Sequence, residues 1–282
     1  PPPPPPPGAA PPPGEAVEHA GAAVADWRAL DVARATNVAG TLAVRDTFPG
    51  ARFVHVSSGS VYDPYRPSVR AREHEAPVAR YLDAYGSTKA EAERALARDV
   101  ARHPDRGAVV VLRPHAVYGP GDTTLLPRVE AAVRRGRLVL PGGGRVLQSL
   151  THVDTLLAAV RAAVVLPDAA ARAPGGEGGP TPGWLVANVA DAEPVVLRDA
   201  LADALRRRGT AVRVVAVPVR PAWALAGAVE TVARRLRRPE PPRLTRYALS
   251  HLAMERTYDL TVLRDVLGVD PPPTSFAGAH AW

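Results

Sequence analysis

The sequence predicts an α/β protein whose core is a doubly wound parallel sheet. Short apolar segments rich in β-branched residues alternate along the chain with longer segments that carry apolar residues at helical spacing. One short segment, Ala108–Leu112, is apolar throughout, as expected of a parallel strand covered by helices on both faces. With 282 residues, 46% of them hydrophobic, the chain is long enough for one large domain with an appended lobe.

Each element follows from a local pattern. Trp27–Phe48 has apolar residues at helical spacing and is followed by Pro49-Gly50, a pair that stops helices. Arg52–Val56 is short, apolar and β-branched, which predicts a buried strand. Asp83–His103, rich in Ala, Glu and Arg, predicts a long helix. Similar patterns predict strands at Ala108–Leu112, Trp184–Val189 and Val212–Val217, and helices at Thr124–Arg135, His152–Leu166 and Val195–Arg208.

The chain begins with a proline-rich segment, with ten prolines among its first thirteen residues. Proline lacks an amide donor and favours the polyproline II conformation, so residues 1–15 are predicted to form a disordered tail. The Gly- and Pro-rich segment Ala173–Gly183 is predicted to be a loop.

Composition excludes several classes of function. The chain has no cysteine, and its eight histidines lack the spacing of metal ligands, so we expect no disulfide and no metal site. No apolar run approaches the ~20 residues of a membrane span and no signal peptide is visible, which favours a cytoplasmic protein. The net charge of +7 comes from scattered arginines, and the 5% aromatic residues form no stacking platform. We therefore expect a small-molecule substrate and no nucleic acid.

Tyr85 and Lys89 form a YxxxK motif in a predicted helix. Residues four apart lie on one helical face, so the phenol and the ammonium can address the same ligand. A free tyrosine has a pKa of about 10, and a neighbouring ammonium lowers it toward neutrality. Lys89 is the only lysine of the chain, and arginine cannot replace a compact ammonium that must touch hydroxyl groups. The alternative is an exposed helical lysine without a function.

The serine-rich segment Ser57–Ser60 directly follows the predicted strand Arg52–Val56. A hydroxyl at the carboxyl end of a parallel strand lies where open α/β sheets bind ligands. A serine there can hydrogen-bond a substrate carbonyl and hold it for Tyr85. The alternative is a serine-rich turn without a catalytic role.

These motifs occur in the order and spacing of a known family. The chain resembles the extended short-chain dehydrogenase/reductases of the NAD-dependent epimerase/dehydratase superfamily from Val17 to Gly268. The resemblance implies a Rossmann-like fold, NAD or NADP as cofactor, and hydride transfer between the cofactor and a secondary alcohol or ketone. The matching segments are Asn37–Thr41 (NVAGT), Val56–Tyr62 (VSSGSVY), Ala84–Lys89 (AYGSTK) and Leu112–Asp122 (LRPHAVYGPGD).

The resemblance also implies roles for single residues. Tyr85 matches the proton donor and acceptor, and Ser58 matches the catalytic serine or threonine. Lys89 matches the lysine that binds the nicotinamide ribose and lowers the pKa of the tyrosine. The remaining matches are cofactor-binding positions, namely Gly21, Ala22, Asn37, Pro114, His115 and Val117. Of these, Gly21 and Ala22 fall in the loop after the fourth strand of the family, although Glu18 interrupts the apolar pattern of that strand.

Two residue patterns that this chain lacks indicate to which branch of the family it is most similar. Nucleotide-sugar dehydratases usually carry Asp-Glu after the catalytic hydroxyl, where this chain has Gly59-Ser60. Sugar epimerases commonly carry asparagine where this chain has Ala116. The LRPxxxYGPGD form, with Leu244–Tyr247 and Arg256–Asp259, looks more like the 3β-hydroxysteroid dehydrogenase branch. That likeness implies a hydrophobic alcohol or ketone as substrate.

A dinucleotide-binding fold holds the pyrophosphate with a glycine-rich turn between a strand and a helix, and this sequence has no such turn. Relative to the family, the proline tract replaces the first two βα units, so the choice between NAD and NADP cannot be read. In one explanation, the missing segment lies upstream and the chain is a fragment of an ordinary oxidoreductase. In the other, the protein has lost cofactor binding and persists as a binding or regulatory module. Intact Ser58, Tyr85 and Lys89 favour the first.

We expect a partial NAD(P)-binding Rossmann domain over residues 16–122 and 145–179. A smaller substrate-binding lobe is expected over residues 123–144 and 180–282. The expected function is that of an NAD(P)-dependent oxidoreductase, with a nucleotide-sugar epimerase and a non-catalytic module as alternatives. The family also implies a homodimer through the helices Trp27–Phe48 and Asp83–His103. The sequence gives neither the substrate, nor the direction of reaction, nor the oligomeric state.

Overall fold

The computed structural model describes residues 15–24, 27, 29–167, 170–171, 182–236, 238, 240–242 and 244–282. Apart from Glu15, the predicted tail over residues 1–15 lies outside the described residues, as does most of the predicted loop Ala173–Gly183. Within the described part of the chain, no helix has both the length and the apolar character needed to cross a membrane.

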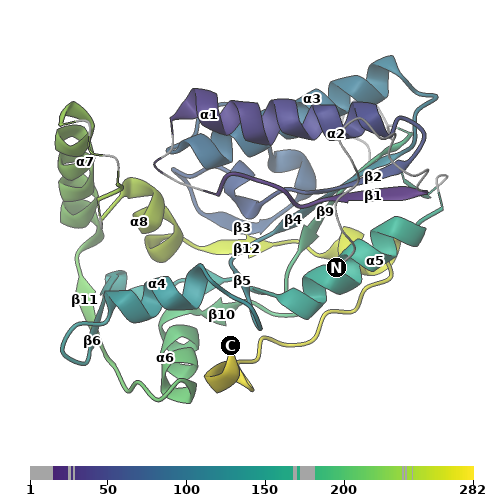
Figure 1. Ribbon diagram of the computed structural model, residues 1–282. Coiled ribbons are helices and arrows are strands. Elements are labelled where there is room, and N and C mark those ends of the chain that lie inside the picture. Colours follow the sequence, from purple (N-terminus) through teal and green to yellow (C-terminus); the bar gives the residue numbers. More distant parts are fainter. Residues whose placement is uncertain are drawn as a thin grey trace.

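The centre of the molecule is a four-stranded parallel sheet in the order β1-β2-β4-β9 (Figure 1). Every side chain of β4 is buried, which explains why its sequence is continuously apolar up to Leu112. β1 is an edge strand, and Glu18, which breaks its apolar pattern, is exposed there. The predicted α/β class with a parallel sheet is confirmed. The strands are β1 (Ala16–His19), β2 (Arg52–Val56), β4 (Val109–Pro114) and β9 (Trp184–Val189).

One face of the sheet is covered by the helices drawn above it in Figure 1. Phe53, Val109 and Val111 of the sheet pack against Leu96 and Val100 of one long helix. The predicted helix Trp27–Phe48 begins only at Leu30, and its middle turn is π-helical. The elements of this layer are α1 (Leu30–Arg34), the π-helical turn Ala35–Ala39, α2 (Gly40–Thr47) and α3 (Ala84–Arg102).

The opposite face is covered by α5 (Val153–Val165) and by a π-helical turn, Val262–Val266. Val110 and Leu112 pack there with Ala159 and Leu263 in the largest apolar cluster. Helices on both faces make the sheet doubly wound, as predicted.

The remaining elements form a smaller lobe, most of which lies below and to the left of the sheet in Figure 1. Its strands make a mixed four-stranded sheet, β10-β7-β12-β3, and two parallel pairs, β6 with β11 and β5 with β8. The strands are β3 (Ser68–Ala71), β5 (Val117–Tyr118), β6 (Arg137–Pro141), β7 (Leu147–Gln148), β8 (Thr151–His152), β10 (Val195–Val196), β11 (Arg213–Val217) and β12 (Arg256–Tyr258). The helices are α4 (Leu125–Ala132), α6 (Leu197–Arg207), α7 (Val219–Arg235) and α8 (Arg246–Ala253). Short 3-10 turns lie at Gly59–Val61, Glu73–Glu75, Gly142–Gly144 and Ala279–Ala281.

Strand pairing changes two of the sequence-based boundaries. Strand β9 pairs with β4 in the central sheet, although the sequence assigned residues 180–282 to the lobe. The predicted helix Val195–Arg208 begins at Leu197, because Val195 and Val196 form strand β10, which pairs with β7. In both cases pairing between segments distant in sequence decides the assignment. The division into two domains otherwise remains a prediction.

Candidate active site

The candidate site lies where the carboxyl ends of β2 and β4 meet the amino-terminal end of α3. Ser58 caps the 3-10 turn Gly59–Val61, because its Oγ accepts a hydrogen bond of 3.1 Å from the amide of Ser60. Gly59 permits this close packing, since a Cβ there would lie 2.9 Å from the hydroxyl of Tyr258. The turn therefore holds Ser58 at the edge of the sheet where ligands bind in open α/β folds.

Helix α3 brings Tyr85 to Ser58. Asp83 caps the helix by accepting a hydrogen bond of 3.4 Å from the amide of Gly86. A Cβ on Gly86 would lie 2.9 Å from the carbonyl oxygen of Ser60, so glycine allows the first turn of α3 to approach the loop after β2. Ser58 lies close enough to Tyr85 for its side chain to lower the pKa of the phenol. The structure thus brings together two residues that the sequence predicted as catalytic.

The surroundings of Tyr85 raise the pKa of its phenol. Burial is the largest cause, because it penalises the phenolate, and the side chain of Ser58 acts in the opposite direction. The charge of Asp83 adds to the increase. Burial thus sets the direction of this shift, and the lowering of the pKa of Tyr85 by Lys89 stays a prediction.

Lys89 lies one turn after Tyr85 on the buried face of α3. Its side chain is 2% exposed, and its Nζ donates a hydrogen bond of 2.7 Å to the carbonyl oxygen of Val56. Burial lowers the pKa of Lys89 to about 8, against the opposing charge of Glu93. An ammonium has three donors, so this buried group suits a ligand that carries hydroxyl groups.

The charge of the Lys89 ammonium lowers the pKa of two nearby histidines. His19 of β1 and His55 of β2 are direct neighbours in the parallel register, and their rings stack with centroids 5.6 Å apart. Burial lowers the pKa of His55 far below its usual range, and the charges of Lys89 and His19 lower it further. Neither ring nitrogen of His55 has a hydrogen-bond partner among the described residues. His55 is therefore neutral at physiological pH and adds no charge beside Lys89.

Asn37 holds the loop that follows β1. Its Oδ1 accepts a hydrogen bond of 2.7 Å from the amide of Ala23, and its Nδ2 donates one of 2.9 Å to Thr88 of α3. Asn37 is fully buried, whereas Gly21 in the same loop is exposed. Asn37 therefore connects this loop to α3. Gly21 and Ala22 directly precede Ala23, whose amide Asn37 binds.

The predicted cofactor segment Pro114–Val117 forms the end of β4 and the start of β5. The amide and the carbonyl of His115 are both hydrogen-bonded to the hydroxyl of Thr151, at 3.0 Å each. The ring of His115 faces the lobe, where its Nε2 lies 3.2 Å from Oε1 of Gln148. Burial lowers the pKa of His115 to about 4. Ala116 has a φ of +48°, the region that favours glycine and asparagine.

A buried ion pair fixes α3 against β4. The side chains of Glu93 and Arg113 are each 1% exposed, and Nη2 of Arg113 lies 2.6 Å from Oε2 of Glu93. Ser57, beside the candidate catalytic serine, donates a hydrogen bond of 2.5 Å to Oε1 of Glu93. Removing one partner of such a pair leaves an uncompensated buried charge. Glu93 thus links α3, β4 and the loop after β2, and sequence reasoning missed it.

Tyr247 of α8 was also missed. Its hydroxyl lies 3.2 Å from Oγ of Ser60, and Ser60 in turn accepts a hydrogen bond of 3.2 Å from Ser58. A chain of hydroxyls therefore connects Ser58 to the lobe. The sequence signal was the Leu244–Tyr247 segment, which matched the family without a role being assigned to it.

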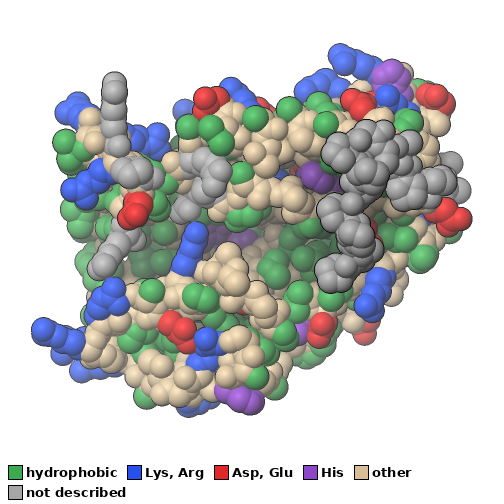
Figure 2. All heavy atoms as spheres, in the orientation of Figure 1, with side chains coloured by type: hydrophobic (Ala, Val, Ile, Leu, Met, Phe, Trp, Pro, Cys, Tyr) green, Lys and Arg blue, Asp and Glu red, His purple; other side chains and the backbone are tan. Residues whose placement is uncertain are grey.

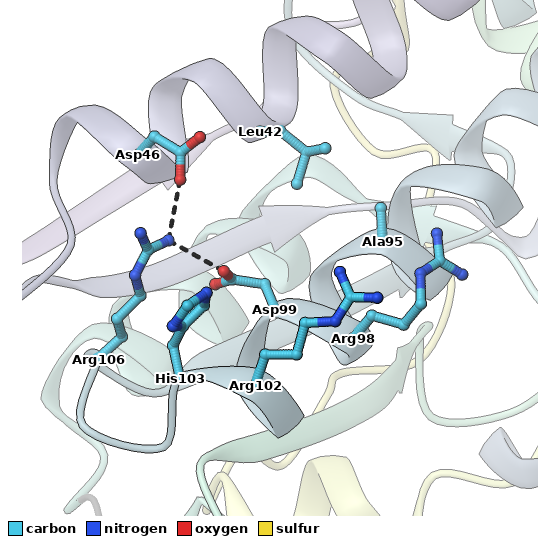
Figure 3. Close-up of a pocket in the computed structure, with 8 residues that line it drawn as sticks. All are labelled: Leu42, Asp46, Ala95, Arg98, Asp99, Arg102, His103 and Arg106. Carbon is cyan, nitrogen blue, oxygen red and sulfur yellow. Dashed lines mark hydrogen bonds and ion pairs between the residues drawn. The ribbon is translucent and has the colours of Figure 1, made fainter.

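A pocket of about 300 Å³ lies between α2 and the carboxyl-terminal half of α3, apart from Ser58 and Tyr85 (Figure 3). At its wall, Nη1 of Arg106 lies 2.9 Å from both Asp46 and Asp99. Its lining includes none of Ser58, Tyr85 and Lys89, and the charges at its wall are paired with each other. The pocket is therefore distinct from the candidate site. Its lining residues are Leu42, Asp46, Ala95, Arg98, Asp99, Arg102, His103 and Arg106.

Comparison with known proteins places this geometry in a family. The model described as "NAD dependent epimerase/dehydratase family" matches residues 13–174. A 4-hydroxy-2-methyl-3-oxo-4-farnesyl-3,4-dihydroquinoline-1-oxide ketoreductase of Stigmatella aurantiaca is 34% identical over 218 residues, covering 74% of this chain and 60% of that protein. A 2-alkyl-3-oxoalkanoate reductase of Stenotrophomonas maltophilia is 30% identical over 264 residues, covering 91% of this chain and 76% of that protein. A 3beta-hydroxysteroid-dehydrogenase/decarboxylase of Arabidopsis thaliana is 28% identical over 247 residues, covering 83% of this chain and 42% of that protein.

Solved structures share the fold. The structure titled "MoeE5 in complex with UDP-glucose and NAD" has a TM-score of 0.66 at 22% identity and covers 95% of this chain and 77% of that one. That of RMD from Pseudomonas aeruginosa complexed with NADPH has a TM-score of 0.63 at 16% identity, covering 96% of this chain and 80% of that one. The predicted Rossmann-like class is thereby confirmed, and NAD dependence is a property of the matched family by its description. The chain spans less than two thirds of the length of some of these relatives, such as 60% of the ketoreductase.

Proposed function

Because the chain belongs to the NAD dependent epimerase/dehydratase family, we propose that it is an NAD(P)-dependent oxidoreductase acting on a secondary alcohol or ketone. One observation carries the proposal. Tyr85 and Ser58 lie close together at the carboxyl edge of the parallel sheet, with the chain's only lysine one helical turn after Tyr85. A proton donor, a carbonyl-orienting hydroxyl and a buried cation are the groups that carbonyl reduction needs.

The residues present fit the nicotinamide half of the cofactor, which when bound supplies or accepts the hydride. The buried ammonium of Lys89 would bind the ribose hydroxyls with the donors that do not face Val56. The loop that Asn37 clamps, with Gly21 and Ala22, would line the same site. The sequence holds no glycine-rich turn for the pyrophosphate, so the fit is limited to that half.

Tyr85 would act as the general acid in the direction of reduction. Burial raises the pKa of its phenol, so the hydroxyl is protonated at neutral pH and can donate to a carbonyl oxygen. Ser58 would hold that oxygen by donating its hydroxyl proton, which the structure directs to Oγ of Ser60 and which would turn to the substrate. Lys89 would place the ribose and favour the developing phenolate by its charge.

A hydrophobic substrate is the class that the relatives support best. The three relatives are named as a ketoreductase for a farnesylated ring, a reductase for an alkylated oxoalkanoate and a steroid dehydrogenase. All three substrates combine a large apolar body with an alcohol or ketone. For this chain we propose a substrate of the same class.

The test is a steady-state assay of the purified chain with a panel of long-chain 3-ketones, following the absorbance of NADH and NADPH. Turnover that disappears in Tyr85→Phe supports the proposal. Interconversion of a nucleotide sugar without net cofactor turnover would favour the epimerase alternative. A folded chain that neither binds the cofactor nor turns over a substrate would favour the non-catalytic module.

We further propose a homodimer that forms through the outer faces of α2 and α3, and a cytoplasmic location. Support for the dimer comes from the two helices lying side by side on one face of the molecule (Figure 1). Sedimentation equilibrium tests it: a monomer at all concentrations would contradict the dimer.

A further inference from the structure

Helix α8 carries two ring side chains next to the candidate active site. Tyr247 and His251 are four residues apart, so they lie on one face of the helix, and their rings contact each other edge-on. Figure 2 shows histidine and hydrophobic side chains together in a hollow near the centre of the molecule, beside the place of α8 and β12 in Figure 1. The two rings therefore form one unit on the side of α8 that meets the site.

The loop after β2 is held in place by two rings. The hydroxyl of Tyr247 lies 3.2 Å from Oγ of Ser60, which accepts a hydrogen bond of 3.2 Å from Oγ of Ser58. The ring of His115 packs against Gly59, since a Cβ added there would lie 3.0 Å from Nδ1 of His115. Because both rings contact this one loop, their positions determine where Ser58 lies.

His251 contacts both of these rings. Its ring centroid lies 4.6 Å from that of Tyr247, in an edge-on arrangement. It lies 5.3 Å from that of His115, with the two ring planes 23° apart in a stacked arrangement. Edge-on and stacked contacts are both favourable between aromatic rings. Removing the ring of His251 therefore takes away a support of Tyr247 and of His115 at once.

Gln148 fixes the part of the chain that carries His251. The side chain of Gln148 is 2% exposed, and its Nε2 donates hydrogen bonds of 2.9 and 2.8 Å to the carbonyl oxygens of His251 and Met254. Because both amide hydrogens of Gln148 are used, its Oε1 accepts from Nε2 of His115, 3.2 Å away. Nδ1 of a neutral His115 is then unprotonated, and this is the side of the ring that faces Gly59. Gln148 thus orients both histidine rings.

The stack of His115 and His251 is neutral at physiological pH. Burial lowers the pKa of His115 to about 4 and that of His251 well below its usual range. The charge of Arg256 on β12 lowers the pKa of both rings further. A proton on either ring would place a second cation beside Arg256, so the two histidines pack as uncharged rings.

We infer that His251 is a positioning residue of the proposed reaction, and that it sets where Ser58 lies relative to the predicted cofactor segment Pro114–Val117. That segment has an anchor of its own, because the hydroxyl of Thr151 binds both the amide and the carbonyl of His115. A change at His251 therefore moves the loop after β2 and leaves the backbone of the cofactor segment in place. The inference rests on the proposed function, in which Ser58 holds the substrate oxygen.

The test compares His251→Ala with His251→Phe. Alanine removes the ring, and kcat is expected to fall about 10- to 100-fold, as for a misplaced catalytic group. The dissociation constant of NADH or NADPH is expected to change less than about threefold, because the cofactor segment keeps its anchor. Phenylalanine keeps a ring of similar size at this position, and kcat is expected to recover to within about threefold of the wild type.

Leu252→Ala is the matched control on the same helix. Leu252 packs against an apolar cluster that includes Leu138 and Leu140, and it has no part in the ring contacts. Its truncation is expected to lower the urea midpoint and to leave kcat unchanged. The urea midpoint also checks that each variant at position 251 is folded.

A second readout does not require turnover. Tyrosine labelled with carbon-13 at Cζ gives a resonance for Tyr85, which is assigned by its loss in Tyr85→Phe. This resonance reports on Ser58, because Ser58 lies close enough to Tyr85 to lower the pKa of the phenol. It is expected to shift in His251→Ala and to stay in place in His251→Phe and in Leu252→Ala.

The outcomes separate this inference from the proposed function. A folded His251→Ala that keeps the wild-type kcat and the wild-type Tyr85 resonance would overturn the inference. It would also be overturned if His251→Phe were as impaired as His251→Ala, or if Leu252→Ala shifted the resonance equally. A wild-type chain without reductase activity would contradict the proposed function alone, and the Tyr85 resonance would still show whether His251 sets the position of Ser58.

Discussion

The Nζ of Lys89 donates a hydrogen bond of 2.7 Å to the carbonyl oxygen of Val56, the last residue of β2. The bond ties the second turn of α3 to the strand that leads into Ser58. Burying this ammonium is unfavourable for folding, as the lowering of its pKa to about 8 shows. A buried cation that opposes stability, and that is the chain's only lysine, is better explained by ligand binding than by structure.

Replacing Tyr85 with phenylalanine removes the proton donor and keeps the ring. We expect kcat to fall by about 10²- to 10⁴-fold, the range for loss of a general acid, with cofactor affinity changed only a few-fold. The matched control is Tyr81→Phe, since the hydroxyl of Tyr81 donates to the carbonyl of Val61 and does not contact Ser58. Steady-state kinetics of both variants measure kcat and so test the role of Tyr85. Full activity in Tyr85→Phe would remove this residue from the mechanism.

Replacing Lys89 with methionine is expected to stabilise the protein at pH 7. The folded-state pKa of about 8 lies below the ordinary value of 10.5, so the unfolded chain holds the proton more tightly. The resulting penalty is present in full below pH 8 and is relieved as the pH rises toward 10.5. We expect a gain of roughly 1–2 kcal/mol at pH 7, after the lost hydrogen bond to Val56 is subtracted.

Urea denaturation at pH 7 and at pH 10 measures this effect. The advantage of Lys89→Met is expected to shrink at pH 10, where the wild-type lysine is neutral when folded. Lys89→Arg is the control, because arginine stays charged at both pH values. An advantage that is independent of pH would show that packing, not the buried charge, explains it.

Elements with a clean local pattern could be predicted from the sequence. Arg52–Val56 and Trp184–Val189 are strands with the predicted bounds, because each is a short apolar run buried in the sheet. Ser58, Tyr85 and Lys89 could be predicted as a group because the segments that hold them, VSSGSVY and AYGSTK, are two of four segments in the order and spacing of the family. The strand before Gly21 and Ala22 was harder to predict, because Glu18 interrupts its apolar pattern. The structure shows that β1 is an edge strand, where an exposed charged residue is tolerated.

Features that depend on contacts between distant segments could not be predicted. β3 and β12 pair across more than 180 residues, and neither has a pattern that names its partner. Tyr247 meets Ser60 in the same way, through the docking of α8 on the loop after β2. The raised pKa of Tyr85 could not be predicted either, because the sequence shows a nearby lysine whereas the depth of burial appears only in the fold.

Gly86→Ala tests the close approach of α3 to Ser60. Alanine favours the helix by about 1 kcal/mol, yet its Cβ would meet the carbonyl oxygen of Ser60 at 2.9 Å. We expect the first turn to shift and separate Tyr85 from Ser58, with activity falling about 10- to 100-fold. Gly40→Ala in α2 is the control, because the nearest atom there lies 3.6 Å away, an ordinary contact. Unchanged kinetics in Gly86→Ala would mean that the site tolerates the shift.

Tyr247→Phe tests the link between the lobe and the site. The variant loses the contact of 3.2 Å with Oγ of Ser60, and a neutral hydrogen bond contributes about 1 kcal/mol. We expect kcat/KM to fall about fivefold, while the urea midpoint changes little. If stability falls and kcat/KM does not, Tyr247 supports the fold and does not position Ser60.

Titration of the purified chain with NADH and NADPH, followed by energy transfer from tryptophan to nicotinamide, tests the proposed site most directly. We expect saturable binding of at least one cofactor that is retained in Tyr85→Phe and lost in Lys89→Ala. Binding that is indifferent to Lys89→Ala, or no binding by a chain shown to be folded, would contradict the assignment of this site to a nicotinamide cofactor.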